Sequence, residues 1–409
     1  MQFLDSVLRL WYNFLKVKNR KEERHMKILI TTDLLTTATN GVVTSVRNLY
    51  EELKNLGHEV RILTLSETHH SYQKEDVYYI RSMSLPIYPD VRMPLSYRHK
   101  LIRELVAWEP DVIHSQCEFF TFRFALYIAK RTGAPLVHTY HTLYEQYTQY
   151  VLPGKRLGKF VAKTFSRYCL DKTDCVIAPS GKIEDTLHSY GVHTDIAVIP
   201  SGISLQQHFM RMSQSERMQK RRELGLDEHQ TVLVNLGRLG TEKNMQELIK
   251  LYAQAAKTNE QLRFLIVGDG PARQELEKLA RSLGVEDRVI FAGMVKPEEV
   301  QKYYQLGDIF VSASTSETQG LTYVEAAANG LPLLCRQDMC LKDIIKPGKN
   351  GYEYTSEAEF LEMVGLMAND PVWRDAAGKF SEEAAMRFDK RQFGRAVQKT
   401  YEQVNTEHL

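Results

Sequence analysis

Short apolar runs rich in β-branched residues alternate along this chain with stretches of helical periodicity, and this alternation restricts the fold most strongly. The runs of a first series are "KILITT", "EVRILTL", "DVIHS", "PLVHTY" and "CVIAPS". The runs of a second series are "TVLVNLG", "LRFLIVG", "RVIFAG", "DIFVSAS" and "PLLC". Apolar strands separated by helices predict a parallel sheet covered by helices on both faces. The two series therefore predict two doubly wound, Rossmann-like α/β domains.

The boundary between the two series is predicted within "VIPSGISLQQHF", where Pro200 and Gly202 interrupt the periodicity. We expect four parts, which are an amphipathic basic extension (1–25), a first domain (26–203), a second domain (204–385) and a C-terminal helix that packs back toward the first domain (386–409). In open parallel sheets, ligands bind beyond the carboxyl ends of the strands. The site is therefore expected in a cleft between the two domains.

Composition and charge exclude several classes of protein. Of the 409 residues, 43% are hydrophobic and 25% charged, and the net charge of +2 is too small to favour a nucleic-acid partner. No window approaches the roughly 18 to 20 apolar residues of a spanning helix, so any membrane contact is expected to be peripheral. Residues 1–25 do not resemble a secretory signal, because Asp5, Arg9 and Asn13 interrupt their apolar residues.

The cysteines point to a cytosolic protein without a metal centre. There are five of them, an odd number, and they lack paired metal-ligand spacing. We interpret them as reduced thiols. Cys335 and Cys340 as metal ligands remain the less favoured alternative, since no histidine or second cysteine pair stands near them.

The stretch "SETQGLTYVEAAANG" carries two carboxylates around an expected helix start. Gly320 permits a tight turn, and the free amides of Gly320, Leu321 and Thr322 would form an anion site suited to phosphate. Glu317 precedes this turn and Glu325 lies one helical turn beyond it. Carboxylates accept hydrogen bonds from hydroxyls and repel phosphate. A ligand that fits both the anion site and the two carboxylates therefore has hydroxyls on either side of a diphosphate, as a nucleotide sugar does. The alternative is an ordinary loop carboxylate and a solvated helix residue.

Two cations suited to a diphosphate follow the first strand of the second series. In "GRLGTEKN", Arg238 can grip phosphate oxygens bidentately and Lys243 adds a point charge, unless both are merely solvated loop residues. The next strand leads into "IVGDGPAR", where Arg273 replaces the third glycine of a dinucleotide fingerprint. This departure weakens a dehydrogenase interpretation, and Gly268 and Gly270 are expected to shape a turn.

The first series contributes a glycine and a histidine. Gly41 in "TNGVVTSV" lies at a strand-to-helix turn, where its backbone can approach the donor phosphate or the acceptor. His141 in "PLVHTYHTLYEQY" follows a strand and is expected to point into the cleft as a polar ligand for sugar or for transferred charge. His138 and His114 also lie at strand ends, and for these two a structural role is favoured.

Together these motifs resemble the retaining glycosyltransferases of family 4, which have the GT-B fold of two Rossmann-like domains. The resemblance covers Met26 to the C-terminus, while "NGVVTSV" and "HTYHTLYEQYTQY" more narrowly resemble bacterial enzymes that glucosylate diacylglycerol. The resemblance implies that Glu317 and His141 contact the donor hexose and that Glu325 binds the ribose hydroxyls. It also implies that Arg238 and Lys243 bind the diphosphate and that Gly41 lies on the phosphate side of the first domain. The segment "LLTTATNG" lacks the proline that family members often have there.

The resemblance also implies the chemistry. No essential metal or other cofactor is expected, since Arg238, Lys243 and the helix amides would stabilise the departing nucleotide diphosphate. Attack by the acceptor on the front face, assisted by the donor phosphate, would retain the anomeric configuration. The expected function is transfer of a hexose to diacylglycerol in glycolipid synthesis; UDP-glucose is the favoured donor, although the sequence does not distinguish it from UDP-galactose. Two alternatives stay open: a transferase for a soluble or polysaccharide acceptor, and a non-catalytic nucleotide-sugar-binding protein.

Two basic amphipathic stretches predict an anionic membrane surface as a partner. In residues 1–17, Leu4, Leu8 and Trp11 share an apolar helical face with an interfacial aromatic ring. The segment "PGKRLGKFVAKTFSRYCLDK" repeats this pattern with the basic residues Lys155, Arg156, Lys159, Lys163, Arg167 and Lys172. We expect the protein in the cytoplasm, peripherally bound to the inner face of the cell membrane. The alternative is that the first helix packs on protein and the second has an ordinary solvated face.

Overall fold

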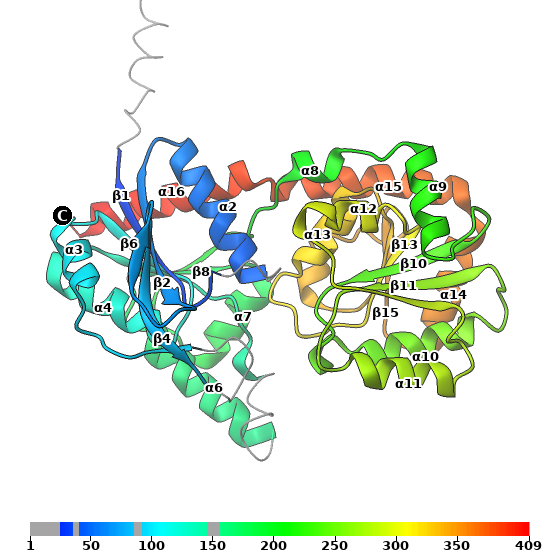
Figure 1. The fold of residues 1–409 in the computed structure, drawn as a ribbon, viewed down its shortest axis with the longest axis horizontal. Coiled ribbons are helices and arrows are strands. Elements are labelled where there is room, and N and C mark those ends of the chain that lie inside the picture. Colours follow the sequence, from blue (N-terminus) through cyan, green and yellow to red (C-terminus); the bar gives the residue numbers. More distant parts are fainter. Residues whose placement is uncertain (1–24, 36–40, 86–91, 146–154, 409) are drawn as a thin grey trace, which may run out of the picture.

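The computed structural model describes residues 25–35, 41–85, 92–145 and 155–408, which form two α/β domains lying side by side (Figure 1). The predicted extension up to residue 24, including Trp11, lies outside the described residues. Each domain has a central sheet with helices on both faces, as the alternation of apolar runs predicts.

The sheet of the first domain has the strand order β3-β4-β2-β1-β6-β7-β8-β9, and β5 pairs with β4. Its strands are β1 (Lys27–Thr31), β2 (Glu59–Ser66), β3 (Tyr72–Lys74), β4 (Val77–Ser84), β5 (Arg92–Pro94), β6 (Val112–Ser115), β7 (Leu136–Thr139), β8 (Cys175–Ala178) and β9 (Ile196–Val198). All pairings are parallel except those of β3 and β5 with β4. The helices of this domain are α2 (Gly41–Asn55), α3 (Lys100–Ala107), α4 (Phe120–Thr132), α6 (Lys155–Leu170) and α7 (Gly181–Tyr190).

The sheet of the second domain is entirely parallel, with the order β12-β11-β10-β13-β14-β15. Its strands are β10 (Thr231–Leu236), β11 (Leu262–Val267), β12 (Val289–Gly293), β13 (Ile309–Ser312), β14 (Leu333–Arg336) and β15 (Gly351–Tyr354). The α-helices from the boundary onward are α8 (Leu205–Phe209), α9 (Gln214–Glu223), α10 (Met245–Ala255), α11 (Arg273–Ser282), α12 (Val300–Tyr304), α13 (Leu321–Ala328), α14 (Glu357–Asn369), α15 (Pro371–Ala385) and α16 (Lys390–Glu407). The 3₁₀ turns are η1 (Thr241–Lys243), η2 (Pro297–Glu299), η3 (Met339–Leu341) and η4 (Met386–Phe388).

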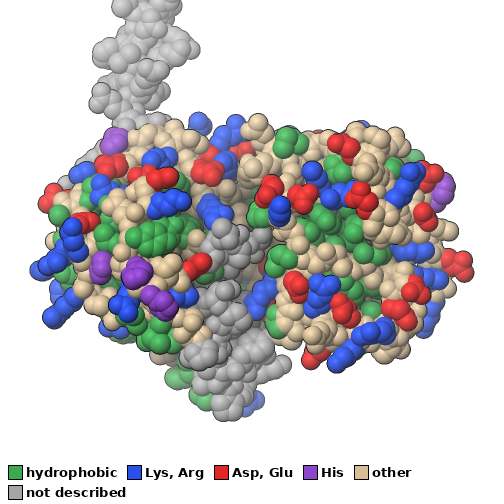
Figure 2. Space-filling model, in the orientation of Figure 1, with side chains coloured by type: hydrophobic (Ala, Val, Ile, Leu, Met, Phe, Trp, Pro, Cys, Tyr) green, Lys and Arg blue, Asp and Glu red, His purple; other side chains and the backbone are tan. Residues whose placement is uncertain are grey.

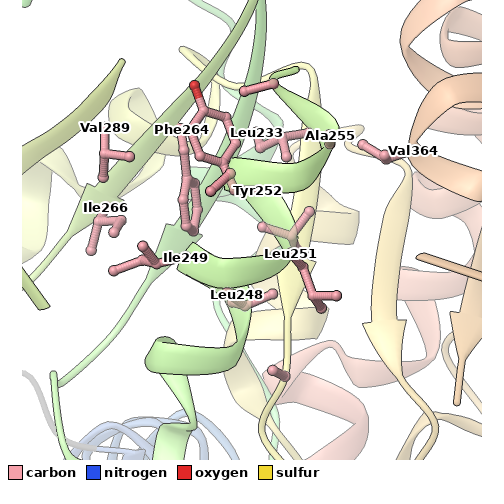
Figure 3. Close-up of a cluster of buried hydrophobic side chains, with 14 of the residues drawn as sticks. Leu233, Leu248, Ile249, Leu251, Tyr252, Ala255, Phe264, Ile266, Val289 and Val364 are labelled. Atoms are coloured by element: carbon pink, nitrogen blue, oxygen red, sulfur yellow. The ribbon is translucent and has the colours of Figure 1, made fainter. Parts of the chain in front are cut away.

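The two faces of each sheet are covered because the helices are amphipathic. In α2, Val43, Val46, Leu49 and Leu53 recur at helical spacing and are buried, and the left-handed Gly57 (φ 88°) follows the helix. In the second domain, Leu248, Ile249, Leu251 and Tyr252 of α10 pack on Leu233 of β10 and on Phe264 and Ile266 of β11 (Figure 3). Burial of these side chains fixes the sheets and thereby the positions of the loops at the strand ends.

The chain crosses between the domains twice, at neighbouring points. Ile203 forms an isolated parallel bridge with Asp389, just before α16 begins. From there α16 runs back along the first domain (Figure 1), where Phe393, Val397, Tyr401 and Val404 join the core formed by β1 and α2. The last helix of the chain thus belongs physically to the first domain.

Five strands of the structure have no counterpart among the predicted apolar runs, namely β3, β4, β5, β9 and β15. These strands lie at or near the outer edges of the sheets, where β3 is fully exposed and β9 is only half-buried. Partial exposure removes the continuous apolar run that marks a central strand. Helix α3 begins at Lys100, where His99 caps it by accepting a hydrogen bond from the Leu101 amide.

Candidate active site

Three loops of the second domain meet at the carboxyl ends of its central strands. The loop after β10 contains Gly237 and Gly240, and the loop after β11 contains Gly268 with φ of 129°. A Cβ atom at Gly268 would collide with the Gly237 carbonyl oxygen, so the two loops pack backbone against backbone. The third loop follows β13, which pairs with β10, and leads into α13. These glycines shape close loop packing, which is the turn-shaping role expected of the "IVGDGP" motif.

Glu317 and Lys243 form an ion pair at the junction of these loops. The Lys243 Nζ lies 2.6 Å from the Glu317 Oε1, although 74 residues separate them in sequence. Burial disfavours the Lys243 ammonium, but the adjacent Glu317 carboxylate outweighs it, so the pKa of Lys243 lies above its usual value. Burial likewise disfavours the Glu317 carboxylate, yet Lys243 holds the pKa of Glu317 below its usual value. The site therefore contains one fixed positive and one fixed negative charge in contact.

Arg238 lies at the rim of the same site. Its guanidinium Nη1 stands 3.7 Å from Oε1 of Glu242, and 39% of its side chain is exposed. Glu242 is only 6% exposed, and its backbone carbonyl accepts a hydrogen bond from Ser316 Oγ at 3.1 Å. Arg238 thus combines an anchored position with an accessible charge, as binding of an anionic ligand requires.

Glu325 has a different environment from Glu317. Its carboxylate accepts a hydrogen bond from the hydroxyl of Tyr304, 2.8 Å away, from the buried side of α12. Burial raises the pKa of Glu325 to about 7, against the opposing effect of the Tyr304 hydrogen bond. The two carboxylates of the motif therefore differ in charge near neutral pH, because one has a cationic partner and the other a neutral one.

The N-termini of two helices from different domains face each other at the cleft. Gly320 precedes α13 with φ of 77°, a left-handed conformation that favours glycine. A Cβ atom built on Gly41, the first residue of α2, would lie 3.7 Å from a methyl group of Leu321. Leu321 and Thr322 are half-buried in the first turn of α13. Both helix dipoles thus favour negative charge near this junction.

His141 lies on the first-domain side of the cleft. Its Nε2 is 2.8 Å from the Gln116 side-chain oxygen, and its carbonyl accepts a hydrogen bond from Thr318 Oγ1, next to Glu317. Burial, with a smaller effect of His138, lowers the pKa of His141 to about 3. The imidazole is therefore neutral at neutral pH and offers a hydrogen bond rather than a charge.

The other two strand-end histidines have structural partners, as favoured from the sequence. His114 bridges Tyr401 of α16 and Thr139 of β7, at 2.6 Å and 2.7 Å. His138 lies 3.1 Å from a carboxylate oxygen of Glu118, which is itself buried.

The basic residues of α6 that are predicted to bind a membrane lie away from this junction. Arg156, Lys159, Lys163 and Arg167 are exposed on a helix at the lower tip of the first domain in Figure 1. The sequence did not reveal several residues at this junction. Ser180, Lys182 and Ser201 of the first domain contact the loop that carries Glu317. Gln319 belongs to that loop and binds Ser201, and Tyr304 of the second domain binds Glu325 in α13. The only sequence signal for these residues was a lysine or serine that follows a strand, and this pattern is too common to identify a site residue.

Within the part of the chain that the structure describes, no group of three or more His, Cys, Asp or Glu is arranged to hold a metal ion. All five cysteines are free, and Cys335 and Cys340 pack in a hydrophobic cluster of the second domain. None of the described helices combines the length and apolar character needed to cross a membrane.

Solved structures with the same architecture identify the fold class. The Anabaena protein HepE in complex with UDP and glucose superposes with a TM-score of 0.74 and 19% identity, covering 93% of this chain and 100% of that chain. Sucrose-phosphate synthase from Thermosynechococcus elongatus gives a TM-score of 0.73 at 21% identity, covering 94% and 100%. The two facing domains define the GT-B fold of glycosyltransferases.

Sequence comparisons narrow this class. The family model described as Glycosyltransferase Family 4 matches residues 39–207, and that described as Glycosyl transferases group 1 matches residues 216–384. The alpha-monoglucosyldiacylglycerol synthase of Streptococcus pneumoniae is 35% identical over 81% of this chain and 76% of its own length. The synthase of that name from Acholeplasma laidlawii is 30% identical over 92% and 96%. The protein is therefore an enzyme and belongs to glycosyltransferase family 4, which confirms the resemblance inferred from its motifs.

Proposed function

We propose that the protein transfers glucose from UDP-glucose to diacylglycerol, with retention, to form an α-glucosyl lipid. The similarity to two alpha-monoglucosyldiacylglycerol synthases over most of the chain carries this proposal. The similarly folded HepE binds UDP and glucose in its solved complex, which supports the donor class. The Glu317–Lys243 ion pair beside the start of α13 supplies charges that such a donor needs.

In this proposal each group at the junction has one task. The amides at the start of α13 bind the diphosphate with Lys243 and Arg238, and Gly41 allows the first domain to approach it closely. Glu325 accepts hydrogen bonds from the ribose hydroxyls, while Glu317 and the neutral His141 contact the hexose. As the glycosidic bond breaks, the two cations stabilise the negative charge on the leaving UDP. This arrangement needs no metal ion, and the acceptor hydroxyl can pass its proton to the departing phosphate.

The test is product identification. The protein is incubated with UDP-glucose or UDP-galactose and with dioleoylglycerol in vesicles, and the products are identified by mass spectrometry and proton NMR. We expect monoglucosyl-dioleoylglycerol with the α-configuration. Transfer only to soluble saccharides would instead support the polysaccharide-directed alternative, and donor binding without transfer or hydrolysis would support a non-catalytic binder. A β-anomer would contradict retention.

We further propose that α6 docks the first domain on an anionic membrane. Its basic residues alternate with the exposed apolar side chains of Leu157, Phe160, Val161 and Tyr168, of which Phe160 is 66% exposed. Hydrophobic and basic side chains are both visible at the lower tip of the first domain (Figure 2), where α6 begins in Figure 1. An apolar and cationic helix face of this kind binds at the lipid headgroup level. Docking there would place the acceptor-side domain on the inner face of the cell membrane.

Reversing three charges on α6 tests this docking. With Lys159, Lys163 and Arg167 changed to Glu, the protein should no longer sediment with phosphatidylglycerol vesicles, because each basic residue near such a surface contributes about 1 kcal/mol. Transfer to vesicle-borne diacylglycerol should slow, while UDP affinity stays unchanged. Reversing Lys257, Lys278 and Arg281, three exposed cations of the second domain, is the matched control. Unchanged sedimentation of the α6 variant, or equal sedimentation of the wild type with neutral vesicles, would contradict the docking.

The raised pKa of Glu325 predicts a pH dependence of donor binding. With a pKa of about 7, the carboxyl is mostly protonated at pH 6 and mostly ionised at pH 8. Only the ionised form offers all its oxygens to the ribose hydroxyls. The dissociation constant of UDP-glucose should therefore fall, by at most about tenfold, as the pH rises from about 6 to 8. Calorimetric titration measures this change. Glu325→Gln should bind weakly with no such trend, and a flat profile in the wild type would exclude the role of Glu325.

A further inference from the structure

A lysine of the first domain is bound to the loop of the second domain that carries Glu317. Lys182 lies in the first turn of α7, and its Nζ donates to the carbonyl oxygens of Thr315 at 3.1 Å and Glu317 at 3.0 Å. The same ammonium lies 2.6 Å from a carboxylate oxygen of Asp338. The Lys182 and Asp338 side chains are 15% and 5% exposed. All three hydrogens of the ammonium therefore have acceptors in the second domain.

Asp338 extends this contact to a second loop. It follows β14, the neighbour of β13 in the sheet, and its other carboxylate oxygen accepts a hydrogen bond from the Cys340 amide at the start of η3. Lys182 thus ties together the loops that leave two adjacent strands. Since one loop carries Glu317, the backbone around that carboxylate is fixed by a group from the other domain.

The rest of the loop is held in the same way. Ser180 donates its hydroxyl hydrogen to the Thr318 carbonyl, and Gln319 exchanges two hydrogen bonds with the backbone of Ser201, at 2.7 Å and 2.9 Å. Thr318 in turn donates to the His141 carbonyl. Every one of these partners belongs to the first domain. The segment from Thr315 to Gln319 is therefore positioned chiefly from across the cleft.

We propose that Lys182 is a positioning residue for the transfer reaction, which fixes the backbone of Glu317 so that its carboxylate meets the donor hexose. This inference rests on the donor site of the proposed function. A simple adhesive role between the domains is the alternative. The matched control is Lys390, whose ammonium lies 2.7 Å from Glu51 and 3.3 Å from Glu52 of α2, near the domain crossing but away from the loop.

The first experiment compares Lys182→Met with Lys390→Met in steady-state transfer from UDP-glucose and in calorimetric binding of UDP. Because a displacement of about 1 Å can cost up to about a hundredfold in rate, Lys182→Met should lower kcat by about tenfold to a hundredfold. The UDP dissociation constant should change less than about twofold, since Lys182 contacts neither Arg238 nor Glu325. Lys390→Met should keep the wild-type kcat. An unchanged kcat in Lys182→Met, or an equal loss in Lys390→Met, would overturn the proposal.

A rescue experiment separates the ammonium from the fold. Lys182→Cys, alkylated with 2-bromoethylamine, regains an ammonium at nearly the original distance, and its kcat should recover. The wild type treated in the same way controls for reaction at Cys117, the half-buried cysteine, since the other four are buried. Recovery in folded, alkylated protein supports positioning by the ammonium. No recovery would overturn it.

Hydrogen exchange tests the loop without any acceptor or turnover. Amides of the segment 315–319 should exchange faster in Lys182→Met than in the wild type or in Lys390→Met, because their carbonyl anchors are lost. If the wild type transfers no sugar to any acceptor, the proposed function fails, and the exchange measurement alone decides whether Lys182 positions the loop. Unchanged exchange in that segment overturns the inference.

Discussion

Lys243→Met is expected to reduce glucosyl transfer by about a hundredfold to a thousandfold, the effect of removing one group that stabilises charge in a transition state. The substitution removes a cation from the diphosphate site and also leaves the buried Glu317 carboxylate without the partner now 2.6 Å away. Both effects act on the same step. Steady-state kinetics with UDP-glucose, together with thermal unfolding to confirm the fold, measure the loss.

Three further measurements test whether the loss is due to the missing cation at the diphosphate site. Lys250→Met removes an exposed lysine from α10 and should leave transfer unchanged. Arg238→Ala should also lower transfer strongly, since the guanidinium is the second cation at the site. EDTA should have no effect on the wild type. Loss of activity in EDTA with recovery in Mg²⁺ or Mn²⁺ would show that a metal, and not these side chains, neutralises the diphosphate.

The second large effect is expected to distinguish the two carboxylates. Glu317→Ala should lower kcat by about tenfold to a hundredfold with little change in UDP affinity, because its contact is with the hexose. Glu325→Ala should weaken UDP binding by a similar factor, which corresponds to one lost hydrogen bond to a charged group. Calorimetry with UDP and steady-state kinetics separate the two. If both variants kept the wild-type kcat and UDP dissociation constant, Glu317 would not contact the hexose and Glu325 would not bind the ribose.

The double variant with Lys243→Met and Glu317→Gln adds information on their ion pair. If the two side chains act together, the double variant should lose less than the product of the single losses. Strictly multiplicative losses would indicate that the pair seen in the structure has no energetic coupling during catalysis.

The fold was largely predictable because central strands and amphipathic helices leave period-specific patterns in the sequence. The apolar runs placed β1 and β10 within a few residues of their observed bounds, and the turn expected at Gly320 placed the start of α13. Edge strands such as β3 were not predicted, since an exposed strand has no apolar run. The loops bearing Arg238, Lys243 and Glu317 were also located, because strand order places the carboxyl ends of parallel strands at one edge.

The pairings within the site could not be predicted, since they depend on three-dimensional proximity and burial. Nothing local in the sequence indicates that Lys243 pairs with Glu317 or that Tyr304 hydrogen-bonds to Glu325. The difference in pKa between the two carboxylates follows from these partners, so it too required the structure. The same holds for Lys182, which lies 135 residues before the carbonyl of Glu317 that it binds.

The position of α16 has a consequence for how the protein is made. Synthesis delivers β1 to β9 early, yet the hydrophobic side that Phe393, Val397 and Tyr401 cover stays open until residues 390–407 have left the ribosome. The buried hydrogen bond between His114 and Tyr401 also forms only then. The second domain, whose strands and core lie within residues 203–388, can complete its packing first. The N-terminal half of the polypeptide is thus expected to reach its native state last, and a premature stop codon near residue 389 would damage the half translated first.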